Sequence, residues 1–207
     1  MRISLSFIVL TSLGALAARP LFLNPSVRAG TALRMDTNAL VDSASLVVQG
    51  LVLSARGVET EGGMIETEYR LQVERTFEGV DLIERTIRIP GGLLEDGRGL
   101  LLAGLPRLGV GEETLLFLSE PSPSGVRMPV GLSQGRYRIA RTVDGSRVAV
   151  RDQGELGLVD PQTGKVLEAA GQHVRDYAEL IAEVEAAVVR EQALGPRSGV
   201  SSFSEGK

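Results

Sequence analysis

GVGEETLLFLSEPSPSGVRMPVGLSQGRYRI, residues 109–139, is the stretch that decides the fold of this chain. Within it, residues 114–118 form a mostly apolar run of strand length, which is typical of a β-strand that is buried on both faces. The glycine-rich segment before this run and the Pro/Ser segment after it predict connecting loops. Residues 128–139 predict further strand structure beyond the Pro/Ser loop. We therefore expect two or three strands here, around which the rest of the chain pairs.

Upstream of this stretch, the clearest strand is residues 65–77, where apolar and polar side chains alternate with a period of two. Such alternation predicts one face in the core and one face in water, as in an antiparallel sheet. Residues 45–55 predict a central strand with a kink or bulge at Gly50, followed by a polar loop over residues 56–63. Residues 86–90 predict another strand, and residues 93–108 a short strand and loop.

Downstream, the turn Asp144-Gly145 predicts a hairpin that leads into a strand at residues 147–151. A small ribbon is expected at residues 156–159 and 165–167. Apolar residues recur at intervals of three and four from Val174, which predicts a helix over residues 174–194 that Gly195-Pro196 ends. A short helix over residues 38–44 is expected near the other end, with Asp36 or Thr37 as its N-cap.

The chain divides into three parts. Residues 1–29 predict a secretory signal peptide and leader, with an apolar core and small residues before candidate cleavage sites after Ala17, Ala29 or Ala32. Residues 36–194 form one domain of about seven strands with a terminal helix, and the Ser/Gly-rich residues 195–207 predict a disordered tail. The expected location is the periplasm or the secreted fraction, with no integral membrane segment once the signal is removed.

Composition excludes several classes of function. A net charge of −4 without a basic stripe argues against nucleic-acid binding. The absence of cysteine excludes disulfides, thiolate metal sites and cysteine nucleophiles. His173 is the only histidine, so a multi-histidine zinc site is impossible. No glycine pattern matches a dinucleotide or phosphate loop. We therefore expect no cofactor and no metal.

Two candidate catalytic patterns remain. The densest carboxylates are Glu66, Glu68 and Glu74 on the alternating strand, together with Glu112 and Glu113. A hydrolase would need two of them to meet in a cleft, whereas alternating glutamates on a strand ordinarily face water. The second pattern is Ser133 between glycines, which has the spacing of a nucleophile elbow but lacks the required helix after it.

Five segments carry a resemblance to a family. Residues 45–52, 67–79, 87–92, 106–118 and 130–137 come in an order that resembles a group of uncharacterised exported bacterial proteins. Their strand order is similar to the OB-like barrel of the netrin module and the tissue inhibitors of metalloproteinases. The resemblance covers residues 36–140 and implies a mainly β fold, an OB-like antiparallel barrel with a short N-terminal helix and a C-terminal helix. Those inhibitors bind zinc through an N-terminal cysteine that this chain lacks, so no site is transferred.

From this we expect an exported, non-catalytic binding module that recognises a protein partner, with an exported protease as one candidate. The alternatives are a carboxylate-based hydrolase and a structural component of the envelope. Because recognition usually lies in loops on a rigid scaffold, the expected partner-binding residues come from two loops. They are Pro121, Ser122, Pro123, Ser124, Gly125, Gly131, Ser133, Gln134 and Gly135.

Overall fold

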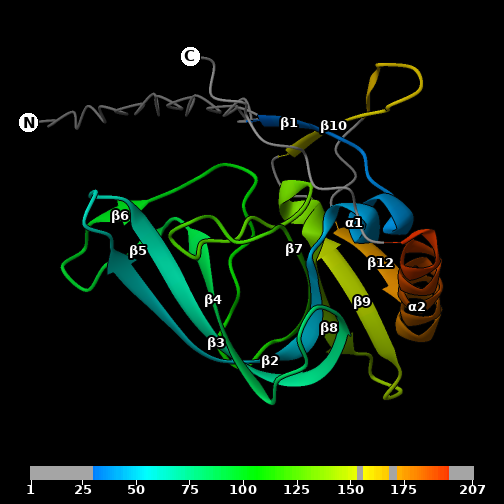
Figure 1. The fold of residues 1–207 in the computed structure, drawn as a ribbon, viewed down its shortest axis with the longest axis horizontal. Coiled ribbons are helices and arrows are strands. Elements are labelled where there is room, and N and C mark those ends of the chain that lie inside the picture. Colours follow the sequence, from blue (N-terminus) through cyan, green and yellow to red (C-terminus); the bar gives the residue numbers. More distant parts are fainter. Residues whose placement is uncertain (1–29, 153–155, 168–171, 196–207) are drawn as a thin grey trace, which may run out of the picture.

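The computed structural model describes residues 30–152, 156–167 and 172–195. The predicted signal peptide and leader, and the tail beyond Gly195, lie outside these residues. A curled, antiparallel seven-stranded sheet dominates the fold, with strand order β12-β9-β8-β7-β2-β3-β4 (Figure 1). Its strands are β2 (Leu46–Glu59), β3 (Ile65–Glu78), β4 (Glu84–Pro90), β7 (Glu113–Leu118), β8 (Arg136–Arg141), β9 (Arg147–Asp152) and β12 (Gln172–Asp176).

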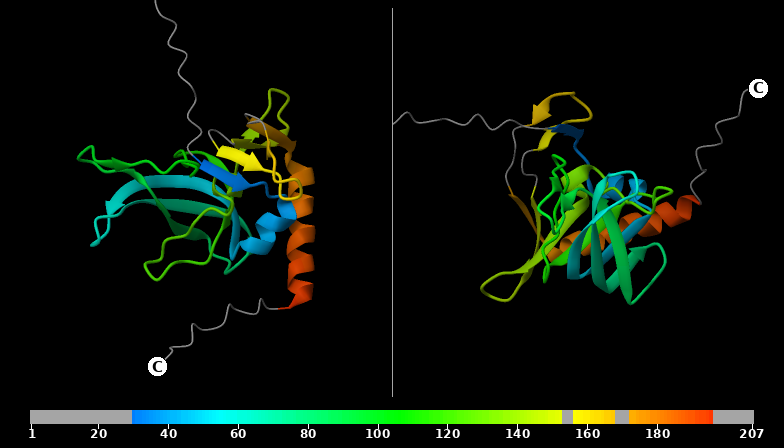
Figure 2. Two further views of the ribbon diagram at one scale, coloured as in Figure 1. Left: turned by 90° about the horizontal axis from the view of Figure 1, so that it is seen from above. Right: turned by 90° about the vertical axis from the view of Figure 1, so that its left-hand side faces the viewer.

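Smaller elements surround this sheet. β1 (Gly30–Leu33), β10 (Leu156–Val159) and β11 (Val166–Leu167) form a separate three-stranded ribbon. β5 (Gly92–Leu93) and β6 (Gly99–Leu100) form a short pair, and a 3₁₀ turn, η1, covers Leu132–Gly135. The two helices are α1 (Thr37–Ser43) and α2 (Tyr177–Leu194), and α2 stands along one side of the sheet (Figure 2).

The mainly β, antiparallel prediction is confirmed, but the sheet is not closed into a barrel. Among the described strands, β4 and β12 are its two edges and do not pair with each other. At the β4 edge, the Arg127 N–H donates to the Arg88 carbonyl at 2.9 Å. A loop therefore covers this edge where a closed barrel would have another strand.

The stretch chosen from the sequence does lie at the centre of the sheet. β7 pairs with β2 on one side and with β8 on the other. Leu115 and Phe117 point to the helices, whereas Leu116 and Leu118 point to the opposite, curled face, and all four are fully buried. Burial on both faces explains why this strand reads as a continuous apolar run.

β2 and β3 form a long hairpin. The bulge expected at Gly50 is present as a register shift between Gln49 and Gly50, and an added Cβ there would lie 3.1 Å from the Gln72 carbonyl carbon. The loop expected over residues 56–63 was wrong, because β2 continues to Glu59. Its polar residues pair with β3 as far as Glu59 and Ile65, which leaves only the turn at its tip.

The two helices differ slightly from expectation. Asp36 caps α1 by accepting from the Ala39 N–H at 2.8 Å. The predicted helix start at Val174 was wrong, because Val174 lies in β12 opposite Val150. Asp176 then caps α2. The apolar periodicity continues through the strand into the helix, so it cannot mark the boundary. At the other end, Gly195 closes the helix with φ 88° as predicted.

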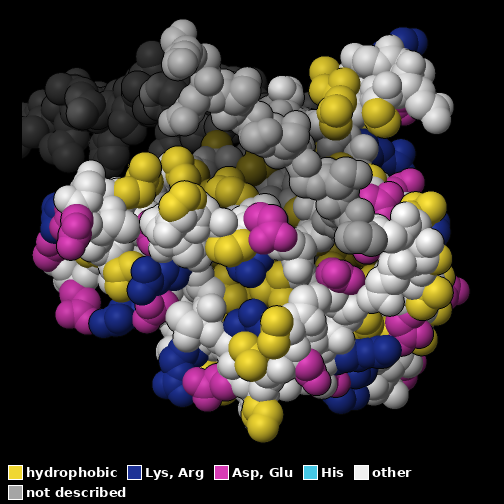
Figure 3. All heavy atoms as spheres, viewed as in Figure 1, with side chains coloured by type: hydrophobic (Ala, Val, Ile, Leu, Met, Phe, Trp, Pro, Cys, Tyr) yellow, Lys and Arg dark blue, Asp and Glu magenta, His cyan; other side chains and the backbone are white. Residues whose placement is uncertain are grey.

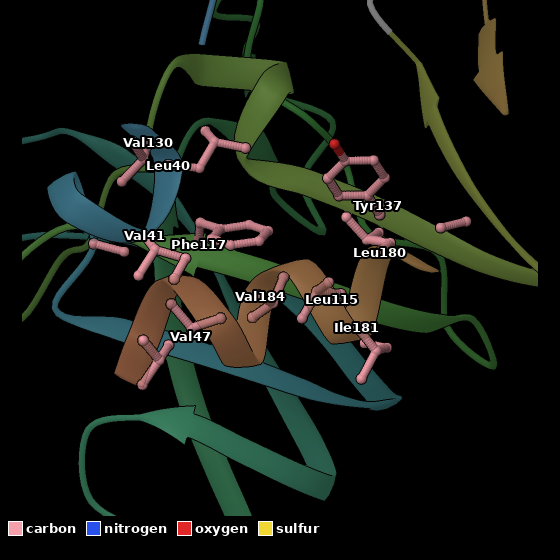
Figure 4. Close-up of a cluster of buried hydrophobic side chains, with 14 of the residues drawn as sticks. Leu40, Val41, Val47, Leu115, Phe117, Val130, Tyr137, Leu180, Ile181 and Val184 are labelled. Atoms are coloured by element: carbon pink, nitrogen blue, oxygen red, sulfur yellow. The ribbon is translucent and has the colours of Figure 1, made fainter. Parts of the chain in front are cut away.

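The helices cover one face of the sheet and build the larger core cluster. Leu180, Ile181 and Val184 of α2 belong to the same buried cluster as Leu115 and Phe117 of β7 (Figure 4). The opposite face forms a second cluster, which includes Tyr69, Leu71 and Leu116 and is closed by Leu108 of the loop before β7. The fold thus places a buried strand between two cores.

Candidate functional site

The predicted Pro/Ser binding loop is exposed and tightly turned. The Gly125 N–H donates to the Ser122 carbonyl at 2.8 Å, and the Val126 N–H donates to Ser122 Oγ at 3.1 Å. Pro121, Pro123 and Ser124 complete this exposed turn. The loop therefore has a defined shape rather than being a loose connection, and it sits beside the edge of β4.

Beside this loop lies a cavity of about 750 Å³, which we call the hairpin groove. One wall is the tip of the β2–β3 hairpin and the other is the loop after β7. Six of the residues that line it are Thr60, Met64, Glu66, Arg88, Ser124 and Val126. The groove thus joins one part of the predicted binding loop to a carboxylate that the sequence also singled out.

Glu66 is the unusual member of the groove. Alternation along β3 predicts that it faces water, and this was wrong, since its side chain is only 4% exposed. Its Oε2 atom is buried and has no hydrogen-bond partner. The burial follows from the hairpin tip and the loop folding over this end of the strand face. Burying a polar group without a partner costs free energy. A hydrogen-bond donor brought to this oxygen by a ligand would therefore stabilise it.

The neighbouring carboxylate is already satisfied. Glu68 accepts from Arg56 at 3.2 Å and from Arg88 at 3.3 Å. The hydrogen bond from Arg56, assisted by Arg88, holds the pKa of Glu68 below its ordinary value against a weaker effect of burial. Arg88 lines the groove but donates to Glu68, and among the described residues no cation pairs with Glu66.

The second predicted binding segment lies inside the protein. Ser133, Gln134 and Gly135 of η1 are buried, and Gly131, just before it, is half-buried. The Gln134 side chain accepts from the Met35 N–H at 2.9 Å and donates to the Leu33 and Gly131 carbonyls. Its role in the fold is to hold the segment between β1 and α1 against η1. The two predicted segments therefore differ, and Pro121–Gly125 is the one that a partner can reach.

Of the five candidate carboxylates, only Glu74 and Glu113 come together, and Arg147 forms ion pairs with both of them. Glu66 lies opposite Val58 of β2, whereas Glu113 lies opposite Leu51. Seven residues of strand separate these positions, which is roughly 20 Å. Glu113 and Glu74 instead both accept from Gln49, whose Oε1 accepts from the Tyr177 hydroxyl. These groups form a polar network beneath the N-terminal end of α2.

The other single residues have no catalytic partner in the described part of the chain. His173 lies on β12 opposite Arg151, and Asp176, three residues further on, caps α2. The Ser133 Oγ atom is buried without a hydrogen-bond partner. In residues 30–152, 156–167 and 172–195, no cluster of three or more acidic or histidine side chains could hold a metal ion. Neither described helix has the length and apolar content needed to cross a bilayer.

Sequence reasoning missed a second cavity, of about 840 Å³, beneath the three-stranded ribbon. Arg151, Tyr137 and Arg175 help to line it. Nothing in the sequence marks Arg151, because an arginine at a strand end is ordinarily exposed, whereas here its side chain is buried. The cavity is assembled from β8, β9, β12 and α2 with the segment after β1, so no local pattern could reveal it.

Substituting Glu66 with methionine is expected to raise the free energy of unfolding by about 1 kcal/mol, because a side chain of similar volume replaces a buried oxygen that lacks a partner. Urea denaturation of the two proteins measures the difference. The same substitution at the exposed Glu95 is the matched control and should change stability by less than about 0.5 kcal/mol. A clear loss of stability in Glu66→Met would show that the carboxylate is satisfied and the interpretation is wrong.

The comparisons with known proteins add no relative. No protein-family model matches this sequence, and no match was found among curated proteins. The function is therefore inferred from the residues of the site.

Proposed function

We propose that this protein is an exported, non-catalytic binding module that recognises a protein partner through the hairpin groove. An exported protease is one candidate partner, and the proposed location is the periplasm or the secreted fraction. We also propose that the curled sheet is an open relative of the OB-like barrel, in which the loop beside Arg88 takes the place of a closing strand contact.

The observation that supports this function is the buried Oε2 atom of Glu66, which has no hydrogen-bond donor among the described residues. A lysine or arginine side chain of a partner would supply that donor as a charge-assisted hydrogen bond. Acids outnumber cations among the residues that line the groove, where Arg88 is the one cation of the described lining. Glu59 and Glu61 also line the groove. Glu59 is already paired with Arg98 at 2.6 Å. Glu66 is therefore the buried acid of the groove that lacks a hydrogen-bond donor.

The groove also matches the apolar part of such a side chain. Met64, which is 53% exposed, lies beside Pro90 and Val126 in the lining. Lysine and arginine carry several methylenes before the charged group, and these pack well on apolar walls while the head reaches a carboxylate. An apolar wall with one buried acid at its floor therefore favours a basic segment of a partner over an acidic one.

The alternatives rest on less. A carboxylate hydrolase built on Glu66 would need a second carboxylate within about 10 Å. Within the groove, Glu59 is paired with Arg98 and Glu61 is exposed. Glu68, the next carboxylate along β3, is engaged by two arginines. Glu112 and Glu113 lie much farther along the sheet. A structural envelope component would need no groove with an unmet acid. The three hypotheses differ in whether the binding of a specific partner requires Glu66.

The test is a pull-down with the immobilised full chain from envelope and culture fluid of the source organism, read by quantitative mass spectrometry. Wild type is compared with Glu66→Gln and with a chain in which residues 121–125 are reordered. We expect one partner to be enriched and its recovery to fall at least tenfold in both variants, because each removes part of the groove.

Glu95→Gln is the matched control, since it removes one exposed acid that does not line the groove and should leave recovery unchanged. Thermal melts establish that every variant is folded. Recovery of the partner by Glu66→Gln at the wild-type level would reject the groove. Enrichment of nothing over blank resin would favour the structural alternative.

A further inference from the structure

The cavity beneath the ribbon is built around a buried arginine. Arg151 extends from β9, its side chain is 7% exposed, and its guanidinium lies over the Tyr137 ring at 5.1 Å from the ring centroid. Its Nε and Nη1 atoms are buried and have no hydrogen-bond partner. Figure 4 shows the Tyr137 hydroxyl pointing away from the core cluster that its ring helps to form. The phenol and the guanidinium thus meet at the cavity wall.

The other arginine on this wall shows what Arg151 lacks. Arg175 of β12 donates to Glu183 of α2 with both terminal nitrogens, at 2.9 and 2.5 Å. These hydrogen bonds raise the pKa of Arg175 above its ordinary value. By contrast, burial lowers the pKa of Arg151, and the charges of Arg175 and Arg34 add to this effect against that of Tyr137. Arg151 has therefore lost its water, and no acid among the described residues pairs with it.

The acids that line the cavity are already engaged. Glu183 also accepts from the Thr37 hydroxyl at 2.8 Å in addition to its two bonds from Arg175. Asp36 accepts from the Ala39 N–H as the cap of α1. Within the described residues, no carboxylate forms an ion pair with Arg151, and Arg34 adds a further positive charge to the lining. A buried group whose donors are unmet in the protein commonly marks the place of a missing polar partner.

Apolar side chains share the lining with the polar Thr37, Asn38 and His173. The apolar residues of the lining are Met35, Leu158, Leu167 and Ala186. A small inorganic anion would meet the arginine and leave these walls uncovered. A carboxylate attached to an aromatic or aliphatic body would engage both.

We infer that this cavity is a binding site for a small organic carboxylate, with Arg151 binding the carboxylate and the apolar walls holding the body of the ligand. None of the residues that line it also lines the hairpin groove. This site therefore stands independently of the proposed protein partner, and each can fail without the other.

His173 supplies a direct reporter, because it is the only histidine in the chain and also lines the cavity. Partial burial and the charges of Arg151, Arg175 and Arg34 hold its pKa below the ordinary value. The cavity's acids, Glu183 of α2 and Asp36 before α1, are the opposing charges. A bound anion would add negative charge and should therefore raise the pKa of His173.

The experiment titrates the purified full chain, free of histidine tags, with 4-phenylbutyrate, octanoate and inorganic phosphate in low-salt buffer. Binding is followed by calorimetry and by the NMR signal of the His173 imidazole as a function of pH. We expect saturable, one-to-one binding of at least one of the two organic acids, much weaker binding of phosphate, and a rise in the His173 pKa on saturation with that acid.

Arg151→Met removes the charge while keeping the volume and should weaken binding at least tenfold. It should also raise the pKa of His173 in the free protein. Arg141→Met, at the exposed end of β8, is the control and should bind as wild type does. Absence of saturable binding by both organic acids, or equal binding by Arg151→Met, would overturn the inference. If phosphate bound as tightly as the tighter-binding of the two organic acids, the assignment of the ligand as an organic carboxylate would be overturned.

Discussion

Replacing Phe117 with alanine is expected to lower the free energy of unfolding by about 4 kcal/mol. Phe117 is fully buried at the centre of the helix-facing cluster. Its ring lies edge-on to that of Tyr137, with centroids 6.3 Å apart and planes at 64°. The substitution therefore removes the free energy gained by burying the phenyl ring and the contact with the Tyr137 ring. It also leaves a void between the sheet and the helices. Urea denaturation of wild type and variant measures the loss.

The matched control is Val143→Ala at the tip of the β8–β9 hairpin, where the side chain is fully exposed. Its stability should lie within about 0.5 kcal/mol of wild type. Equal denaturant slopes for the two proteins would show that stability has changed and not the extent of unfolding. A loss below about 1.5 kcal/mol for Phe117→Ala would mean that the two layers are not packed as described here.

Replacing Gly135 with alanine is expected to cost 3 kcal/mol or more, or to prevent folding, at about the upper limit for overpacking. An added Cβ would lie 2.7 Å from Val130 N and 2.9 Å from the Phe117 carbonyl oxygen, and closer still to the Val130 carbonyl oxygen. These are backbone atoms, and the Val130 N–H is bonded to that Phe117 carbonyl at 2.9 Å. Neither the Val130 backbone nor the Phe117 backbone can move without breaking the contact between β7 and the loop after it.

Gly62→Ala at the β2–β3 tip is the matched control for this effect. The nearest atom to an added Cβ there is Thr60 Oγ1 at 3.9 Å, so the change should be neutral or stabilising by up to about 1 kcal/mol. The comparison uses thermal melts together with soluble yield. A Gly135→Ala protein that melts within a few degrees of wild type would show that η1 can shift at little cost.

The exposed surface around the β5–β6 pair carries apolar side chains that belong to neither proposed binding site. Leu93 and Leu101 are largely exposed, and Leu102 is partly exposed. Figure 3 shows hydrophobic side chains gathered over this region, while acidic and basic side chains are interspersed over the lower part of the same face. Neither the groove nor the cavity includes Leu93, so this surface does not enter the tests described above.

Most strands of the sheet were predictable, because their information is local. The alternation of β3, the apolar run of β7 and the Asp144-Gly145 turn each specify a strand or turn from neighbouring residues. The bulge at Gly50 was likewise predicted from a glycine within a strand. The failures lie at boundaries. β2 extends past Ala55 and α2 starts after Val174, because pairing with another strand decides where a strand ends, and the partner is distant in sequence.

The candidate site was predicted only in part. The exposed turn at residues 121–125 and the glutamates of β3 were singled out from the sequence, yet nothing local indicated that Ser124 and Glu66 line one groove. Gln134 and Gly135 were expected at a surface because glycine-flanked polar residues usually form loops. They are buried because the segment between β1 and α1 folds against η1 and binds the Gln134 amide.

The sequence by itself determined the mainly β character, the central strand, the two helices and the absence of cysteine chemistry. These depend on side-chain periodicity and composition, which are readable residue by residue. Only the tertiary structure decided which polar groups lose water. Glu66 and Arg151 look like surface residues in the sequence, but folding brings distant segments over each of them and leaves atoms without partners. Burial is a property of the packed chain, and here it creates both proposed binding sites.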